Sequence, residues 1–187
     1  MRPPFIVEVA VYIVQEDRMS LLLTVKRAAA GLMVASAIAF AGSSAQAEIN
    51  RISQHGYWET VSGSLDGYPV TGAMTKMNDG SVAAVLITRG DVTFRLSGKT
   101  WNLDTGEDVR VRVVIDGSGF KGRARAINDQ DLEVTDLKME FIQALIDGRK
   151  AYVEVNGERW QLNLTGITAS LKEAVALYAS QSGRSRR

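Results

Sequence analysis

The chain has 187 residues, no cysteine, one histidine and a formal net charge of +1. Without cysteine it forms no disulfide, thiolate metal site or thiolate nucleophile, and one histidine is too few for a two-histidine metal site. The near-neutral charge argues against a nucleic-acid-binding protein, because such proteins neutralise phosphates with an excess of Lys and Arg.

Residues 19–47 have the organisation of a secretory signal peptide. Residues 26–27 are cationic, residues 28–41 are apolar, and residues 45–47 form the small-x-small pattern at which such peptides are cleaved. An apolar run of this length is too short to span a bilayer. We therefore expect cleavage after Ala47 and a periplasmic or secreted protein whose mature chain has no transmembrane segment.

The signal-peptide segment separates a short N-terminal stretch from the main part of the chain. Residues 1–18 lie ahead of the cationic start, so they are expected to be a mis-assigned upstream extension, with Met19 as the translation start; the alternative is an unusually long n-region that begins at Met1. Removal of 47 residues from 187 leaves 140, enough for one domain, which we expect at 48–180. Residues 48–187 keep 18 Lys and Arg and 18 Asp and Glu, so the mature chain is neutral overall. Residues 181–187 are expected to be a disordered basic tail.

The mature part of the chain predicts many short β-strands separated by turn residues. Its first stretch, 48–56, is polar and is expected to be an irregular lead-in. The stretch 62–69 is dense in Gly, Ser, Asp and Pro, which indicates a loop. The continuous apolar run 82–88 predicts a strand that is covered on both faces. In chain order, strands are expected at residues 57–61, 71–77, 82–88, 92–96, 109–115, 120–126, 132–134, 151–155 and 159–164.

A helix followed by a hairpin is expected after the seventh of these strands. Residues 137–146 are amphipathic, with Asp136 as the expected N-cap and Gly148 as the left-handed residue that ends the helix. Asn156-Gly157 stands between two alternating runs and predicts a type I′ hairpin turn, because both central residues of that turn need a positive φ.

The end of the chain predicts a second helix, and the spacing of all elements indicates the fold class. Ser170 and Glu173 have the spacing of a capping box, so we expect this helix to begin at Leu171. Strands that recur about every 8–12 residues with turns between them indicate an antiparallel sheet. We therefore predict a mainly β fold, an antiparallel β-sandwich or barrel-like domain with two short C-terminal helices.

One pair of predicted strands carries a concentration of cations. In residues 109–115 the valines alternate with arginines, and residues 120–126 repeat the pattern. If these strands pair, the cations share one sheet face. One interpretation is an ordinary solvated face paired with nearby acids. The other is a patch for an anionic glycan, a lipid headgroup or an acidic protein surface. The residues of this candidate patch are Arg110, Arg112, Lys121, Arg123 and Arg125.

Three carboxylates alternate in a short acidic stretch, at Asp129, Asp131 and Glu133. Calcium loops use such oxygen clusters, but a glycine is expected after the third ligand and Val134 stands there. A solvated turn is therefore the favoured interpretation. Pairs of such carboxylates also hydrolyse glycosides when they face each other across a cleft, which is the alternative. Glycine-rich phosphate loops are absent from the sequence, and we expect no cofactor or metal.

The remaining candidates are one imidazole and three indoles. His55 lies in the polar lead-in and is expected to be an exposed surface residue, not part of a catalytic set. Trp58, Trp101 and Trp160 are candidate carbohydrate platforms. Trp160 shares a strand face with two leucines, which favours a core position for it.

The last third of the chain resembles the invasion-associated locus B family of small exported bacterial proteins. The resemblance lies in residues 141–148, the hairpin that follows, and residues 162–171, where a Leu-x-Gly-hydrophobic step enters the last helix. It implies a periplasmic or envelope-associated, non-enzymatic β-rich domain, linked in some members to host-cell invasion. Members of the family often carry cysteines, which this chain lacks.

Together these observations predict a non-catalytic binding or interaction protein of the cell envelope. Its partner is expected to be a protein, glycan or lipid, and not a nucleic acid. The alternative is a carboxylate-dependent hydrolase that acts on envelope glycans, with its catalytic pair drawn from the acidic stretch that contains Asp129.

Overall fold

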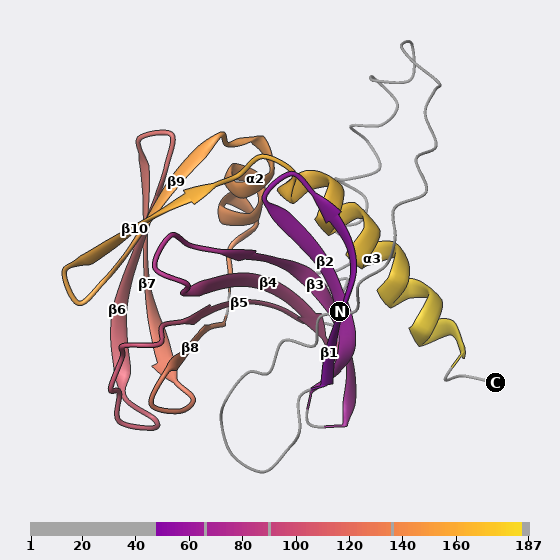
Figure 1. Ribbon diagram of the computed structural model, residues 1–187, viewed down its shortest axis with the longest axis horizontal. Helices are drawn as coiled ribbons and strands as arrows, with labels where there is room; N and C mark the ends of the chain where they lie inside the picture. The colour runs from indigo at the N-terminus through magenta and orange to yellow at the C-terminus, as the bar shows by residue number, and fades with distance from the viewer. Residues whose placement is uncertain (1–47, 66, 90, 136, 185–187) are drawn as a thin grey trace.

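The structure, a computed structural model, describes residues 48–65, 67–89, 91–135 and 137–184. The expected extension 1–18 and signal peptide 19–47 lie outside these residues. The fold is mainly antiparallel β, as predicted. One ten-stranded sheet has the strand order β1-β2-β3-β4-β5-β8-β7-β6-β9-β10, and it curls into a half-barrel with two helices (Figure 1). Among the described residues no helix has the length and apolarity needed to cross a membrane.

The bounds of the elements follow the chain from Glu48 onward. The strands are β1 Glu48–His55, β2 Trp58–Leu65, β3 Tyr68–Lys76, β4 Val82–Thr88, β5 Asp91–Ser97, β6 Asp108–Ile115, β7 Ser118–Ala126, β8 Asp131–Val134, β9 Lys150–Val155 and β10 Glu158–Asn163. The helices are α2 Met139–Asp147, which lies between β8 and β9, and α3 Ile167–Arg184 near the C-terminus.

Two predictions for the N-terminal part of the domain are wrong. The stretch 48–56 is not an irregular lead-in, because β1 pairs along its length with β2. Its polar sequence reflects an edge strand with one buried position, Ile49, and a register shift after Arg51 that breaks the alternation. The expected loop 62–69 is also mostly strand, since β2 continues to Leu65 and β3 begins at Tyr68.

Gly63 in this stretch is required for the close approach of two strands and not for a turn. A Cβ at Gly63 would overlap the backbone of Glu48 on β1, so only glycine lets the two strands pair here. The small and turn-forming residues of the stretch 62–69 thus belong to closely paired strands. Amino-acid composition alone does not distinguish such a stretch from a loop.

The later strands agree closely with the expected ranges. The apolar run of β4 is buried on both faces, as predicted. The type I′ prediction at Asn156-Gly157 agrees with φ values of 51° and 84°. Asp116-Gly117 makes the equivalent turn between β6 and β7, with φ values of 45° and 91°.

Both helices begin at other residues than expected, and α2 ends differently. Helix α2 starts at Met139, and the residue before it, Lys138, gives no side-chain cap; the expected N-cap, Asp136, lies outside the described residues. Gly148 is extended, with φ −73°, and not left-handed. Glycine is needed there because a Cβ would press on Ile115 of β6 and on the backbone of α2.

Helix α3 is longer than expected at both ends. It begins at Ile167, one turn before the predicted Leu171, and the N–H of Ser170 already donates to the carbonyl of Gly166. The capping-box prediction is therefore wrong. The helix continues to Arg184, so the expected disordered tail 181–187 is helical over 181–184, and its last three residues lie outside the described part.

The two sheet faces bury two separate apolar clusters. The larger one fills the inner face, which we define as the face on which α2 and α3 pack, and includes Phe94, Val113 and Leu162. Phe141 of α2 meets Phe94 edge-on, with ring centroids 5.5 Å apart. The smaller cluster lies on the opposite, outer face of β1 to β4.

The two ends of the curled sheet meet at the start of α3. The N–H of Tyr57, in the β1–β2 turn, donates to the carbonyl of Thr165 at 3.1 Å. The indole N–H of Trp58 donates to the carbonyl of Asn163 at 2.8 Å. Gly166 has φ +100°, and a Cβ there would overlap the carbonyl oxygen of His55. This joint brings the N-terminal hairpin and the last strand together backbone to backbone.

Candidate functional site

The five predicted cations lie together on the outer face of β6 and β7. The register places Arg110 opposite Arg123 and Arg112 opposite Lys121, while Arg125 lies opposite Asp108. Directly opposite residues of an antiparallel pair project from the same face, so the two strands present all five cations on one side. All five are exposed, whereas the intervening valines of β6 are buried in the inner core. We call these five residues the basic face.

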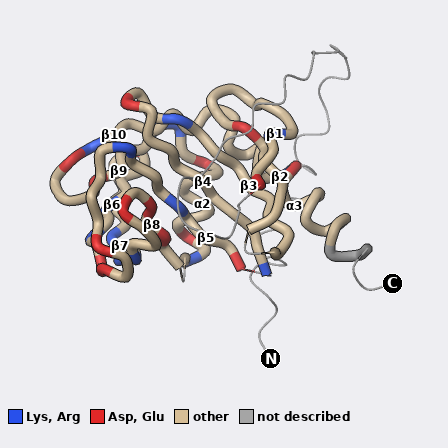
Figure 2. The backbone as a smooth tube through the Cα atoms, turned by 60° about the horizontal axis from the view of Figure 1, so that its bottom comes forward, with Lys and Arg blue, Asp and Glu red and all other residues tan. Residues whose placement is uncertain are grey.

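Two further cations extend the basic face across the neighbouring strands. The register of β6 with β9 and of β9 with β10 places Arg159 and Lys150 on the same side. Lys and Arg positions lie along β6, β7, β9 and β10, at the end of the molecule away from α3, with Asp and Glu positions among them (Figure 2). Tyr152, 40% exposed, stands among them, with the guanidinium of Arg159 5.8 Å from its ring centroid.

Two acids on this side, Glu154 and Glu133, form ion pairs, and a third, Asp108, lies directly opposite Arg125. Glu154 forms ion pairs with Arg159 at 3.4 Å and, more loosely, with Arg112 at 4.0 Å. Glu133, opposite Arg125 on β8, forms its ion pair with Arg95 at 3.5 Å. Within the described residues this leaves four members of the basic face without an ion pair, namely Arg110, Lys121, Arg123 and Arg125. Among the five cations of the basic face, only Arg112 forms an ion pair within the described residues, although Asp108 and Glu133 lie opposite Arg125 in the register.

The arrangement of the basic face is unfavourable for the fold by itself. Like charges directly opposite each other on paired strands are destabilising, by roughly 0.2–1 kcal/mol per pair. The basic face contains two such pairs, Arg110 with Arg123 and Arg112 with Lys121. Local choices that oppose stability concentrate at functional sites, which makes these strands the candidate binding site.

The three candidate carboxylates do not converge. Asp131 is buried and accepts a hydrogen bond from the side-chain amide of Asn128 at 2.8 Å. Glu133 pairs with Arg95, and Asp129 is exposed in the turn. Among the described residues no group of three or more His, Cys, Asp or Glu side chains is placed to hold a metal ion. The acidic stretch thus organises the β7–β8 turn.

Trp58 does not form a carbohydrate platform. It is fully buried, with 0% of its surface exposed, in the inner core. Trp160 and Trp101 are half-buried and pack edge-to-face, with ring centroids 5.6 Å apart. The indole N–H of Trp160 donates to Asp79 at 2.6 Å. Burial raises the pKa of Asp79, but hydrogen bonds from Ser81 and Trp160 outweigh it, so its pKa lies below the ordinary value.

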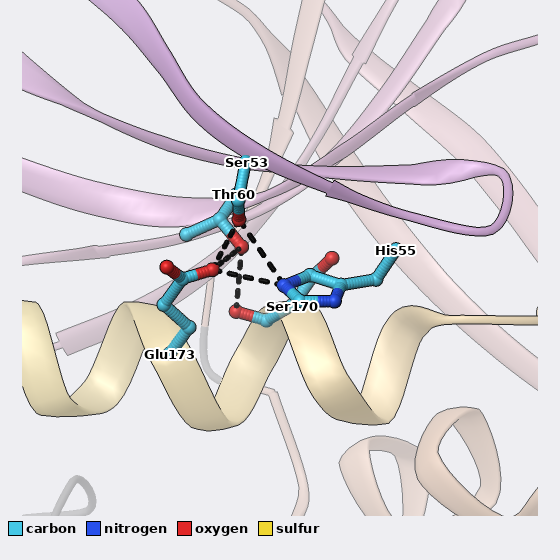
Figure 3. A network of polar contacts seen from close by, with 5 residues as sticks. All are labelled: Ser53, His55, Thr60, Ser170 and Glu173. Carbon is cyan, nitrogen blue, oxygen red and sulfur yellow. Dashed lines mark hydrogen bonds and ion pairs between the residues drawn. The ribbon is translucent and has the colours of Figure 1, made fainter. Parts of the chain in front are cut away.

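His55 belongs to a polar cluster that sequence reasoning missed (Figure 3). Its Nε2 lies 2.9 Å from Oε2 of Glu173 on α3 and 3.1 Å from Oγ of Ser53. The same carboxylate oxygen accepts hydrogen bonds from Ser53 and from Thr60, the latter at 2.7 Å. Thr60 also donates to the carbonyl of Ser170 at 3.4 Å. We call this cluster the α3 clasp, since it joins β1 and β2 to α3.

The α3 clasp is built to hold a carboxylate charge, not to activate a nucleophile. Burial raises the pKa of Glu173, but hydrogen bonds from Ser53, His55 and Thr60 outweigh it, so the pKa lies below its ordinary value. A Ser-His-acid triad uses both ring nitrogens, one for the acid and one for the hydroxyl. Here both partners approach the same nitrogen, Nε2. The partners are 118 and 120 residues apart in sequence, so no local pattern marks them.

No protein-family model, no curated protein and no solved structure matches the chain. The resemblance of the last third to the invasion-associated locus B family therefore stays a prediction. The evidence for the basic face as the candidate functional site is the geometry of β6 and β7, whose register places cations directly opposite each other.

Proposed function

We propose that this chain is an exported, non-catalytic binding protein that attaches to a multivalent anionic partner through the basic face. The observation that carries the proposal is the group of four exposed cations without an ion pair within the described residues, two of which, Arg110 and Arg123, oppose each other directly. Their mutual repulsion is relieved when a partner brings anions between them. The envelope location follows from the signal-peptide pattern of residues 19–47.

The geometry of the basic face favours a partner with several closely spaced anions. Alternate residues of a strand are about 6.8 Å apart, and neighbouring strands are about 4.8 Å apart. The cations therefore form a shallow grid over two strands. Arginine dominates it, and the planar guanidinium pairs in a bidentate manner with phosphate and carboxylate groups. Anionic glycans and lipid headgroups of an envelope offer both groups in repeated arrays.

The test uses the chain from Glu48 onward and two probes, an immobilised anionic polysaccharide and vesicles that contain an anionic phospholipid. In the test variant Arg110, Lys121, Arg123 and Arg125 are all changed to Gln. Each cation near an anionic surface contributes about 1 kcal/mol, so we expect the affinity for one or both probes to fall by roughly 10³-fold and binding to be lost in high salt.

The control is a variant with the same change in net charge elsewhere, at Arg51, Lys76, Arg89 and Lys99. It should bind as the unchanged chain does. An equal loss of affinity in both variants would show that net charge alone causes the loss. A test variant that binds as tightly as the unchanged chain would overturn the proposal. Loss for the polysaccharide alone, or for the vesicles alone, identifies which source of anions the basic face recognises. Export is tested separately, by mass spectrometry of the envelope-fraction protein, whose N-terminus should be Glu48.

A further inference from the structure

The outer face of β1 to β4 is apolar and buried, in contrast to the basic face. The register brings together side chains from four consecutive strands on this side. Each of them is only 0–3% exposed. We call this cluster the outer apolar face; it consists of Ile49, Val61, Val70, Met74, Ala84 and Leu86.

Neither described helix covers the outer apolar face. Helix α3 lies on the other side, where Thr60 of β2 and Thr71 of β3 donate hydrogen bonds to its backbone carbonyls. Thr60 and Thr71 alternate with Val61 and Val70 along their strands, and alternate residues point to opposite faces. Helix α2 packs its Phe141 against Phe94 in the inner core.

A sheet face without a cover does not bury its side chains to this degree. The same sheet shows this at β6, where the outer positions are exposed and charged while the inner ones are buried. On β3 and β4, by contrast, consecutive residues are buried on both sides, as in sheets that are covered on both faces. The outer apolar face thus requires a cover that the described residues do not supply.

We propose that the outer apolar face is the docking site of the chain's own N-terminal segment, residues 28–41. Apart from Gly31 and Ser36, this segment consists of Ala, Leu, Met, Val, Ile and Phe, so its chemistry fits the face. It is separated from Ile49 by seven residues, 42–48, which span up to about 25 Å when extended. The four strands of the face are about 14 Å across, so the segment reaches all of it.

The other positions outside the described residues are poor candidates for this cover. They are the single residues 66, 90 and 136, the polar residues 185–187, and residues 1–27 and 42–47. Residues 1–27 contain a second apolar stretch, 5–14, but it includes the charged Glu8 and is separated from Ile49 by 34 residues, whereas residues 28–41 carry no charge and end seven residues before Ile49. Cleavage after Ala47 removes the segment and uncovers the outer apolar face, which gives the mature chain a second, apolar surface besides the basic face.

The absence of cysteine from the sequence allows a direct test with single-cysteine probes. Leu86→Cys reports on the outer apolar face, and Ile87→Cys, the next residue on the same strand, reports on the inner core as a matched control. Each is made in the full chain and in a chain that begins at Glu48, and the rate of maleimide labelling is measured at low protein concentration.

We expect Leu86→Cys to react at least tenfold faster in the shorter chain than in the full chain, and Ile87→Cys to react slowly in both. A second full-length variant, Val34→Asp with Ile38→Asp, leaves the sequence of every strand unchanged and should also speed the labelling of Leu86→Cys. This variant provides the test if the shorter chain does not fold. Equal rates in the full chain, the shorter chain and this variant would overturn the proposal. Protection of the shorter chain that grows with concentration, together with a doubled mass, would assign the face to a second copy and also overturn it.

Discussion

The opposed cations of β6 and β7 predict that stability and binding change in opposite directions. We consider the double change Arg110→Gln with Arg123→Gln, which removes one directly opposed pair and leaves the backbone register intact. Relief of one like-charge pair should raise the free energy of unfolding by roughly 0.2–1 kcal/mol. The same change removes two cations from the binding surface, and should weaken attachment to anionic vesicles by about 2 kcal/mol, or roughly 30-fold.

The two effects are measured on the same preparations of the chain from Glu48 onward. Urea unfolding gives the change in stability, and vesicle co-sedimentation at low salt gives the change in affinity. The control is Lys76→Gln with Lys99→Gln, which lowers the net charge equally on strands and loops away from the basic face and should change neither quantity by much. A double Arg variant that is less stable than the unchanged chain would show that these side chains support the fold, and would refute the functional interpretation.

Three further predictions test the architecture. Gly166→Ala should lower the free energy of unfolding by at least about 3 kcal/mol, because the new side chain would have a positive φ and would overlap the His55 carbonyl. The control is Gly117→Ala, which has a similar φ but open space around it and should lower the free energy of unfolding by about 1–2 kcal/mol. Equal losses in urea unfolding would contradict the joint. The pKa of Glu173 is lowered, so its contribution to stability is present above the ordinary carboxyl pKa and is lost as the pH falls through the folded-state pKa. The stability difference between the unchanged chain and Glu173→Gln should therefore be full just above about pH 4.5 and shrink below it. A difference that does not change between about pH 4.5 and about pH 3 would count against the α3 clasp. Leu162→Ala should cost about 2–4 kcal/mol in thermal or urea unfolding, because it leaves a cavity in the inner core, and a change under 1 kcal/mol would show that the core position is wrong.

The parts of the fold that were predictable depend on short-range patterns. The alternation in β6 and the Asn156-Gly157 turn each depend on residues within one hairpin, so the sequence alone locates them. The basic face was likewise predictable as a set of residues. Its ion pairs were not predictable, because Glu133 and Glu154 belong to strands whose order in the sheet is not the order of the chain.

The parts that were missed depend on contacts between distant segments. Strand β1 looks like a polar lead-in because only one side chain of it is buried, and its pairing with β2 depends on the missing side chain of Gly63. Glu173 has capping-box spacing from Ser170, but its carboxylate instead binds Ser53 and His55 more than a hundred residues away. Tertiary contacts outweigh local helix-start signals there.

The joint between the β1–β2 turn and the start of α3 also fixes the order in which the domain can be completed. Its hydrogen bond links Tyr57 with Thr165, so the first hairpin has no closing partner until Thr165 has been synthesised. Contacts so distant in sequence form late, because a long loop must close before they contribute free energy. A nascent chain that ends before residue 165 thus cannot close the curled sheet at this joint.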